Sequence, residues 1–170
     1  AVRAALEHAR NEDMELVLAQ GVLGTGDVPA ARKQLDELLL RYESHRGALS
    51  TRGRLDVARG NPARARQTLD QLVAQGESIK DQLLEGEIAL AEADPQTAEQ
   101  LFGQVARSRP AHPEAYLGRI RAHLDLGNAR QAAELISRVA PLLGDEGTPI
   151  VLAYLNAHRL RLEGNVQGAR

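Results

Sequence analysis

The sequence contains no cysteine and no tryptophan, and its aromatic residues are limited to three tyrosines and one phenylalanine. Without cysteine, the chain has no disulfides and no thiolate ligands for a metal. A β-sandwich or β-barrel of this length normally contains many more aromatic and β-branched residues. Alanine, leucine, glutamate, glutamine and arginine dominate instead, and these residues favour helices. The composition therefore predicts an all-α protein.

The chain also lacks a block of basic residues and a long apolar run. Its formal net charge is -2, and arginines alternate with acidic residues along the whole length. Because nucleic-acid binding depends on concentrated positive charge, we expect no nucleic-acid partner. No stretch of about 18 apolar residues occurs, so we expect no direct insertion into a membrane, and no secretory signal is present. The sequence starts at Ala1 and stops at Arg170 within a helical pattern, which we interpret as a piece of a longer protein.

Turn-forming pairs of residues recur along the chain at spacings of 34, 33, 34 and 37 residues. Glycine ends a helix readily because it tolerates positive φ angles, and Asp or Asn can cap the helix that follows. The pairs are Gly26-Asp27, Gly60-Asn61, Ala93-Asp94, Gly127-Asn128 and Gly164-Asn165. This spacing predicts a helical hairpin repeated about every 34 residues.

Small residues recur with the same period. An alanine stands five residues after the first member of each turn pair, in the second helix of the hairpin. The first helix carries glycine seven residues before the turn in two of the units. Two helices that cross closely need a residue with almost no side chain where they touch. We therefore predict packing contacts at Ala31, Ala65, Ala98, Ala132, Ala169, Gly53 and Gly86.

Together these signals predict paired helices along the whole chain. The expected helices cover 12–25 and 28–43, 46–59 and 62–75, 79–92 and 95–108, 113–126 and 129–142, then 150–163 and a start from 166. Residues 1–9 are expected to be the end of a preceding helix, and residues 144–149 to form a longer loop. Within one domain covering 1–170, the repeats are then 12–45, 46–78, 79–112, 113–149 and a partial unit at 150–170.

A 34-residue helix–turn–helix unit with small residues at its eighth and twentieth positions resembles the tetratricopeptide repeat. The third unit matches best, at the family's glycine, alanine, aromatic and helix-ending proline positions, which are Gly86, Ala98, Phe102 and Pro110. The resemblance implies an all-α, right-handed superhelical solenoid of antiparallel helix hairpins. About four full repeats would be present, with partial repeats at the ends.

The sequence departs from the family pattern in its first helices. The aromatic residue that is usual early in this helix occurs only at Tyr116. Polar Arg52, Glu85 and Arg119 stand where a buried leucine is common. We therefore expect the first helices to be rotated by as much as one position relative to the family pattern.

The alanine- and arginine-rich composition is similar to that of certain bacterial repeat proteins. Some of these belong to exopolysaccharide or secretion systems of the cell envelope. By this association alone, the periplasm or cell envelope is favoured over the cytoplasm. The sequence leaves the compartment, the parent protein and the identity of the partner open.

The resemblance also implies a binding surface. In this family the first helices line a concave groove that holds a partner protein or peptide. The candidate residues for this groove are Gln20, Arg54, Glu87, Arg121, Tyr154 and His158. Arg54 and Arg121 are expected to contribute most, because arginine can bind a carboxylate through two hydrogen bonds.

The sequence shows no pattern of catalytic or metal-binding residues. Its five histidines lack a second ligand at helical spacing, and no HExxH, GxSxG or phosphate-loop motif occurs. We therefore predict no enzyme activity, no cofactor and no metal. Two other functions stay open. One is a structural spacer or oligomerisation segment of an envelope protein, and the other is a helical repeat that binds single-stranded RNA, which the mixed charge disfavours. Separately, we expect end-to-end self-association of this chain, because its helical pattern stops unfinished at Arg170.

Overall fold

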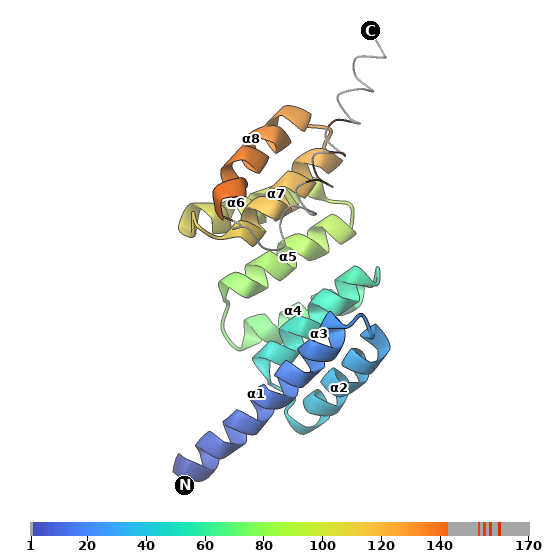
Figure 1. The fold of residues 1–170 in the computed structure, drawn as a ribbon, viewed down its shortest axis with the longest axis vertical. Helices are drawn as coiled ribbons and strands as arrows, with labels where there is room; N and C mark the ends of the chain where they lie inside the picture. The colour runs from blue at the N-terminus through green and yellow to red at the C-terminus, as the bar shows by residue number, and fades with distance from the viewer. Residues whose placement is uncertain (1, 143–152, 154, 156, 158–159, 161–170) are drawn as a thin grey trace. The chain divides into compact units, whose positions relative to one another are not determined.

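The structure is a computed structural model that describes the backbone of residues 2–142, 153, 155, 157 and 160, and the side chains of this set from residue 11 onward (Figure 1). Within this part of the chain there are eight α-helices, one short 3-10 helix and no strand. The helices are α1 (Val2–Gly24), α2 (Val28–Arg41), α3 (Arg46–Ala58), α4 (Pro62–Ala74), α5 (Ile79–Ala91), α6 (Pro95–Ser108), α7 (Pro113–Asp125), α8 (Ala129–Val139) and η1 (Ala140–Leu142). The all-α fold predicted from the composition is confirmed.

Helices α2 to α8 begin at the residues that the sequence predicts, because local signals fix these ends. The carboxylate of Asp27 accepts a hydrogen bond of 3.0 Å from the backbone N–H of Ala30, which caps α2. In the same way, Asp94 accepts a bond of 3.1 Å from the backbone N–H of Thr97 and caps α6. Hydrogen bonding by Thr97, from its side chain and then its backbone, lowers the pKa of the Asp94 carboxyl. Proline occupies the first position of α6, where its missing N–H leaves no bond unmade.

The turns between paired helices use a left-handed backbone conformation. Gly26, Gly60 and Gly127 have φ angles of +87°, +73° and +73°. Ala93 stands at the matching place with a φ of +60°, although its Cβ makes this conformation unfavourable by about 1 kcal/mol. The hairpin geometry is therefore imposed on Ala93 by the helices on either side.

The prediction for the N-terminal residues is wrong. Residues 1–9 were expected to be the end of a preceding helix, but α1 runs without interruption from Val2 to Gly24. The reason is local, since the segment Arg10-Asn11-Glu12 contains neither glycine nor proline to end a helix. Of the helix predicted at 150–163, the structure describes only residues 153, 155, 157 and 160, which are helical. The predicted loop at 144–149 and the helix from 166 lie outside the described residues.

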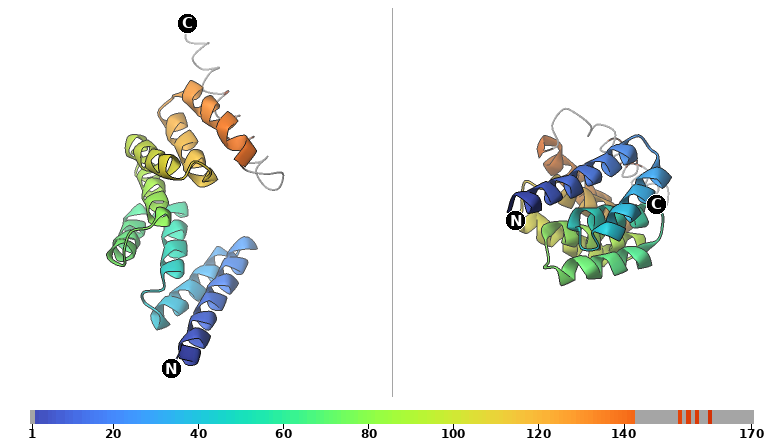
Figure 2. Two further views of the ribbon diagram at one scale, coloured as in Figure 1. Left: turned by 90° about the vertical axis from the view of Figure 1, so that its left-hand side faces the viewer. Right: turned by 90° about the horizontal axis from the view of Figure 1, so that it is seen from below.

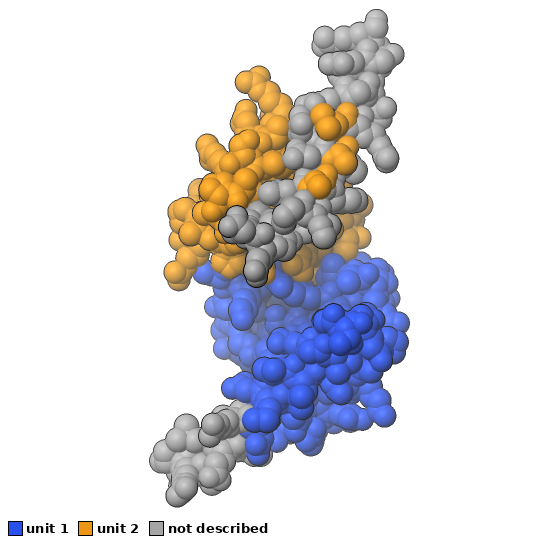
Figure 3. All heavy atoms as spheres, in the orientation of Figure 1, with its two compact units in different colours: residues 1–84 blue, residues 85–170 orange. Residues whose placement is uncertain are grey.

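The chain divides into two compact units, residues 1–84 and residues 85–170, so that α5 contributes to both (Figure 3). In the first unit, α1 packs on α2, α3 packs on α4, and α2 contacts α3. In the second unit, α7 packs on both α6 and α8. The left view of Figure 2 shows α1 beside α2 and α7 beside α8. That the two units continue as one solenoid stays a prediction.

Alanine occupies the contact between the helices of each described hairpin. The four alanines of the predicted series have no exposed surface: Ala31, Ala65, Ala98 and Ala132. Larger apolar residues that follow at four and seven positions are buried as well, including Leu35 and Leu38 in α2 and Phe102 and Val105 in α6. The fifth predicted alanine, Ala169, lies outside the described residues.

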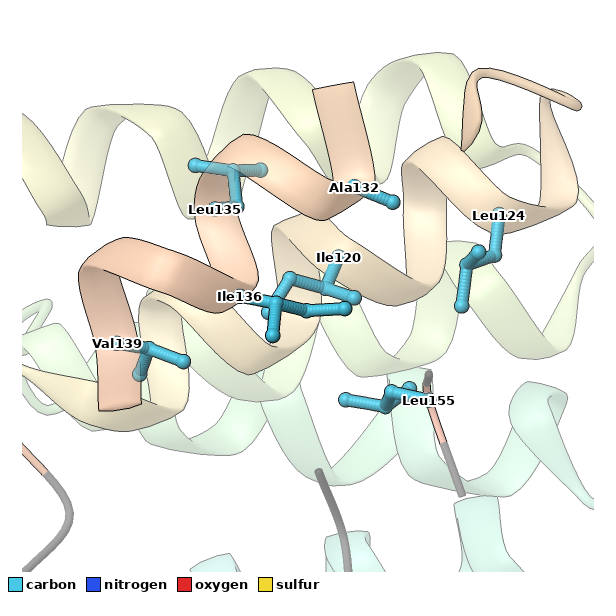
Figure 4. Close-up of a cluster of buried hydrophobic side chains, with 7 residues drawn as sticks. All are labelled: Ile120, Leu124, Ala132, Leu135, Ile136, Val139 and Leu155. Carbon is cyan, nitrogen blue, oxygen red and sulfur yellow. The ribbon is translucent and has the colours of Figure 1, made fainter. Parts of the chain in front are cut away.

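The apolar core of the second unit shows how such a hairpin is filled. Ile120 and Leu124 of α7 face the apolar side of α8 (Figure 4). Tyr116 and Leu117 pack against the margin of this cluster. The buried members are Ile120, Leu124, Ala132, Leu135, Ile136, Val139 and Leu155. The helices of this hairpin are thus held together mainly by the burial of aliphatic side chains.

Phe102 fills a space that exists because two neighbouring helices carry glycine. A Cβ atom added at Gly86 of α5 would lie 2.7 Å from Cζ of the Phe102 ring. A Cβ atom added at Gly118 of α7 would lie 2.5 Å from several ring atoms. The ring is 2% exposed and has little freedom to move away. Gly53 has a similar role in the first unit, since an added Cβ would lie 2.9 Å from Cδ2 of Leu84.

A buried ion pair joins three helices of the first unit. The carboxylate of Asp81 is 2% exposed and pairs with the guanidinium of Arg46. Asp81 also accepts hydrogen bonds from the backbone N–H of Ser78, at 2.8 Å, and from the Ser78 hydroxyl, at 2.9 Å. Arg46 donates a further bond of 3.0 Å to the carbonyl oxygen of Leu72. The start of α3 is therefore fixed to the end of α4 and the start of α5.

The glycine contacts with Phe102 lead to a test of the packing. We expect Gly118→Ala to lower the free energy of unfolding by about 1–3 kcal/mol, because the new methyl group overlaps the ring. The matched control is Gly21→Ala in α1, where an added Cβ meets nothing within 4 Å. This control should gain as much as about 1 kcal/mol from helix propensity alone. Urea denaturation measures both, and equal stability of the two variants would show that the contact is not tight.

Candidate functional site

The predicted groove residues lie on the first helices of their hairpins. In the first unit, Gln20 is exposed on α1 and Arg54 is half-buried on α3. Nε2 of Gln20 donates a hydrogen bond of 3.3 Å to the hydroxyl of Thr51 and so connects α1 to α3. In the second unit, Glu87 is half-buried on α5 and Arg121 is exposed on α7.

The remaining two candidates, Tyr154 and His158, lie outside the described residues. The structure brings Gln20 and Arg54 onto adjacent helices of one unit, and it places Glu87 and Arg121 in the other. Their role in binding stays a prediction.

The polar residues at the family's leucine position point toward the second helices. Nη2 of Arg52 donates hydrogen bonds to the hydroxyl of Thr68, at 3.4 Å, and to Oε1 of Gln71, at 3.3 Å. Arg119 donates two bonds to Oε1 of Glu99, from Nη2 at 2.6 Å and from Nε at 3.0 Å. Arginine can replace leucine at these two positions because polar side chains of α4 and α6 accept its hydrogen bonds.

A polar pocket of about 230 Å³ lies in the first unit between α2, α3 and α4, and we call it the α2–α4 pocket. Nη1 of Arg32 lies 3.9 Å from Oδ1 of Asp56, and its Nε lies 3.7 Å from Oδ2 of Asp36. The Asp56 side chain is only 6% exposed. The lining residues are Arg32, Asp36, Arg52, Asp56, Arg64, Gln67, Thr68 and Gln71. Of these residues, only Arg52 stands out in the sequence, as a polar residue at a position where leucine is common.

In the second unit, the acidic and the basic side chain exchange places at the equivalent positions. Two repeats after Arg32 stands Glu99, and two repeats after Asp56 stands His123. Nε2 of His123 lies 3.8 Å from Oε1 of Glu99, so the basic group is now on the first helix of a hairpin. The two pairs thus join the same two positions with opposite polarity.

His123 is held in an environment that disfavours its charged form. Its side chain is 13% exposed. Burial lowers the pKa of the imidazole, and Arg119 lowers it further, while the carboxylate of Glu99 acts in the opposite direction. Nδ1 is buried and has no hydrogen-bond partner among the residues that the structure describes. Protonation of the imidazole is therefore less favourable in the folded protein than in the unfolded chain.

The polar side chains described above form ion pairs and hydrogen bonds between helices. In the described ranges, no group of three His, Cys, Asp or Glu side chains could hold a metal ion. None of the helices within these ranges is long and apolar enough to cross a bilayer. The described side chains offer guanidinium, carboxylate and amide groups that can bind a partner.

The state of His123 predicts a pH dependence of stability. Because its pKa in the folded protein lies below the ordinary value of 6.5, the unfolded chain binds a proton that the folded chain resists. Its contribution to stability is therefore present above pH 6.5 and is lost as the pH falls through the folded-state pKa. We expect His123→Gln to flatten the decline in unfolding free energy between about pH 7 and pH 5. The unfolding free energy of the wild type and of the variant is measured by urea denaturation at each pH. If both decline equally as the pH falls, this assignment is contradicted.

Comparison with known proteins gives matches over both units. Two family models, each described as a tetratricopeptide repeat, match residues 16–78 and residues 89–147. No curated protein matches the chain. The matched ranges cover the hairpins with the buried alanines Ala31, Ala65, Ala98 and Ala132.

One solved structure with the same fold is a tetratricopeptide repeat protein from Parabacteroides merdae, with a TM-score of 0.72 and 20% sequence identity. The match covers 99% of this chain and 62% of that protein, so this chain spans less than two thirds of its length. At this identity, the likeness supports the fold alone. Repeats of this kind generally mediate protein–protein interaction and are typically non-catalytic scaffolds. The hairpin period, the alanine contacts and the two family matches agree, and the chain belongs to the tetratricopeptide repeat family.

Proposed function

We propose that this chain binds a protein or peptide partner through one face of its first helices. The supporting observation is the direction of the polar side chains on α3 and α7. Arg52 and Arg119 reach the second helices α4 and α6. Arg54 and Arg121 stand two residues further along, which is a rotation of about 200° around the helix axis. On α3 and α7, this rotation directs Arg54 and Arg121 away from those contacts, which supports the proposal for these two residues.

The chemistry of this face favours a partner with acidic groups. Arginine contributes disproportionately to binding energy at protein interfaces, and its guanidinium can hold a carboxylate through two hydrogen bonds. Arg121 is exposed on α7 and is accessible to such a group. Gln20 and Glu87 add an amide and a carboxylate, which can fix the register of a peptide backbone or a basic side chain.

The proposal is tested with the double variant Arg54→Glu/Arg121→Glu. A partner captured by the wild-type chain should bind this variant at least about tenfold more weakly, which corresponds to about 1.4 kcal/mol or more. The matched control is Arg59→Glu/Arg130→Glu, because Arg59 and the 90% exposed side chain of Arg130 are outside the predicted face. Affinity is measured by calorimetry after capture, and circular dichroism verifies the fold of both variants. The proposal fails if the two double variants bind equally well.

A second function, self-association, is favoured by an apolar stripe on α1. Met14, Val17 and Leu18 have exposed fractions of 58%, 64% and 60%. Their spacing of three and four residues places them on one side of the helix. Exposed apolar side chains that are contiguous in this way are typical of surfaces that contact another protein.

We expect the mass of the wild-type chain in solution to rise with concentration if this stripe mediates association. Met14→Lys/Leu18→Lys should then remain monomeric, because two charges cannot be buried at the interface without a large cost. Light scattering measures both chains over the same concentration range. A wild-type chain that stays monomeric throughout excludes self-association through α1.

A further inference from the structure

We propose that the α2–α4 pocket binds a single carboxylate group, carried by a small organic acid or by an acidic side chain of a peptide. This site is separate from the face proposed above for partner binding. Arg52 and Asp56 both line the pocket, and Arg54 lies between them in the sequence. On a helix with about 100° per residue, Arg54 is directed to the opposite side of α3.

The net charge of the pocket favours a bound anion. Three arginines and two aspartates line it, which gives an excess of one positive charge. Arg32 lies within 4 Å of both aspartates and neutralises part of their charge. Arg52 and Arg64 form no ion pair with a carboxylate anywhere in the described part of the chain. The pocket is therefore bordered by two guanidinium groups, those of Arg52 and Arg64, that have no acidic partner within the described ranges.

The hydrogen bonds of Arg52 also favour an additional acceptor. Its two bonds, at 3.3 and 3.4 Å, are long and end on the neutral groups of Gln71 and Thr68. A bond from guanidinium to carboxylate is shorter, about 2.7–2.9 Å, and roughly twice as strong as one between neutral groups. Thr68 itself is 3% exposed and donates to the carbonyl oxygen of Arg64, so it is fixed in place. The floor of the pocket is thus a rigid polar surface.

Size and charge limit the ligand. The pocket volume of about 230 Å³ is below the range of about 300–1,000 Å³ that is usual for cofactors and drug-sized molecules. A carboxylate on a short stem fits this space, and the side-chain amide N–H groups of Gln67 and Gln71 can donate hydrogen bonds to its oxygens. Asp36 and Asp56 oppose a second negative charge, which disfavours a phosphate monoester relative to a single carboxylate.

The second unit does not repeat these features. Glu99 stands in place of Arg32, and Gln131 stands in place of Arg64. Arg119, the equivalent of Arg52, is already bonded to the carboxylate of Glu99. Among the residues that the structure describes, the equivalent positions of the second unit therefore lack the two guanidinium groups without an acidic partner that line the α2–α4 pocket.

The test uses N-acetylglutamate amide as a probe with one carboxylate, and N-acetylglutamine amide as its neutral counterpart. The Nε–H resonances of Arg52 and Arg64 are followed by ¹H–¹⁵N NMR during titration of each probe. We expect saturable shifts with the glutamate derivative only, because the neutral glutamine derivative cannot form an ion pair with guanidinium. Equal responses to the two probes, or no response at both arginines, would overturn the proposal.

Variants of the pocket complete the test. Arg64→Gln should weaken binding of the glutamate derivative at least about tenfold, as expected for the loss of one charged hydrogen bond. Since the Arg64 side chain makes no bond to other described residues, this variant should keep its fold. Arg130→Gln on α8 is the control and should bind like the wild type. Unchanged affinity in Arg64→Gln would also overturn the proposal.

Two further titrations identify the source of the carboxylate and separate this site from the partner-binding face. Butyrate, which carries one carboxylate, distinguishes the two sources. Butyrate that binds as tightly as the glutamate derivative points to a free organic acid, whereas tighter binding of the glutamate derivative points to a peptide side chain. The variant Arg54→Glu/Arg121→Glu should leave both titrations unchanged. A loss of binding in that variant would show that the carboxylate is held by the other face and not by the pocket.

Discussion

The structure depends on the close approach of paired helices at residues that have almost no side chain. Ala31, Ala65, Ala98 and Ala132 are fully buried at equivalent places in successive hairpins. Because each side chain ends at Cβ, the two helix backbones can lie near one another. Larger residues one and two turns further along then fill the space between neighbouring hairpins. A longer side chain at the alanine position would separate the helices and displace everything that packs on them.

Much of this fold could be predicted from the sequence because its signals are local. The caps and turns around Asp27 and Asp94 fix where helices start, and the buried alanines follow them at a constant distance. The continuous α1 and the contact of Gly118 with Phe102 were missed. Helix α1 continues because no glycine or proline near residue 10 ends it. The contact of Gly118 depends on which helices become neighbours in space. Gly118 carries no sign of this contact in the sequence, since it stands two positions before the family's glycine position.

The candidate sites could be predicted less well, for a physical reason. Arg54 and Arg121 are predicted as binding residues from their positions in the family pattern. The structure adds only which helix carries each residue and how exposed it is. The α2–α4 pocket is built from three helices whose polar residues are spread over 40 positions of the chain. No spacing rule connects such residues, because they meet only after the hairpins have packed. Arg52 was the one visible signal, as a charged residue at a position that normally holds leucine.

The exchange of acidic and basic side chains between these two positions has a consequence for how similar hairpins pack on their correct neighbours. A chain of near-equivalent units can misassemble by docking a helix against the wrong copy of its partner. If α3 packed on α6, the buried Asp56 would meet Glu99 and lose the arginine that accompanies it. If α7 packed on α2, His123 would meet Arg32, and its charged form would be disfavoured further. Mispaired helices would therefore lose these contacts, which disfavours docking of a helix against the wrong copy of its partner.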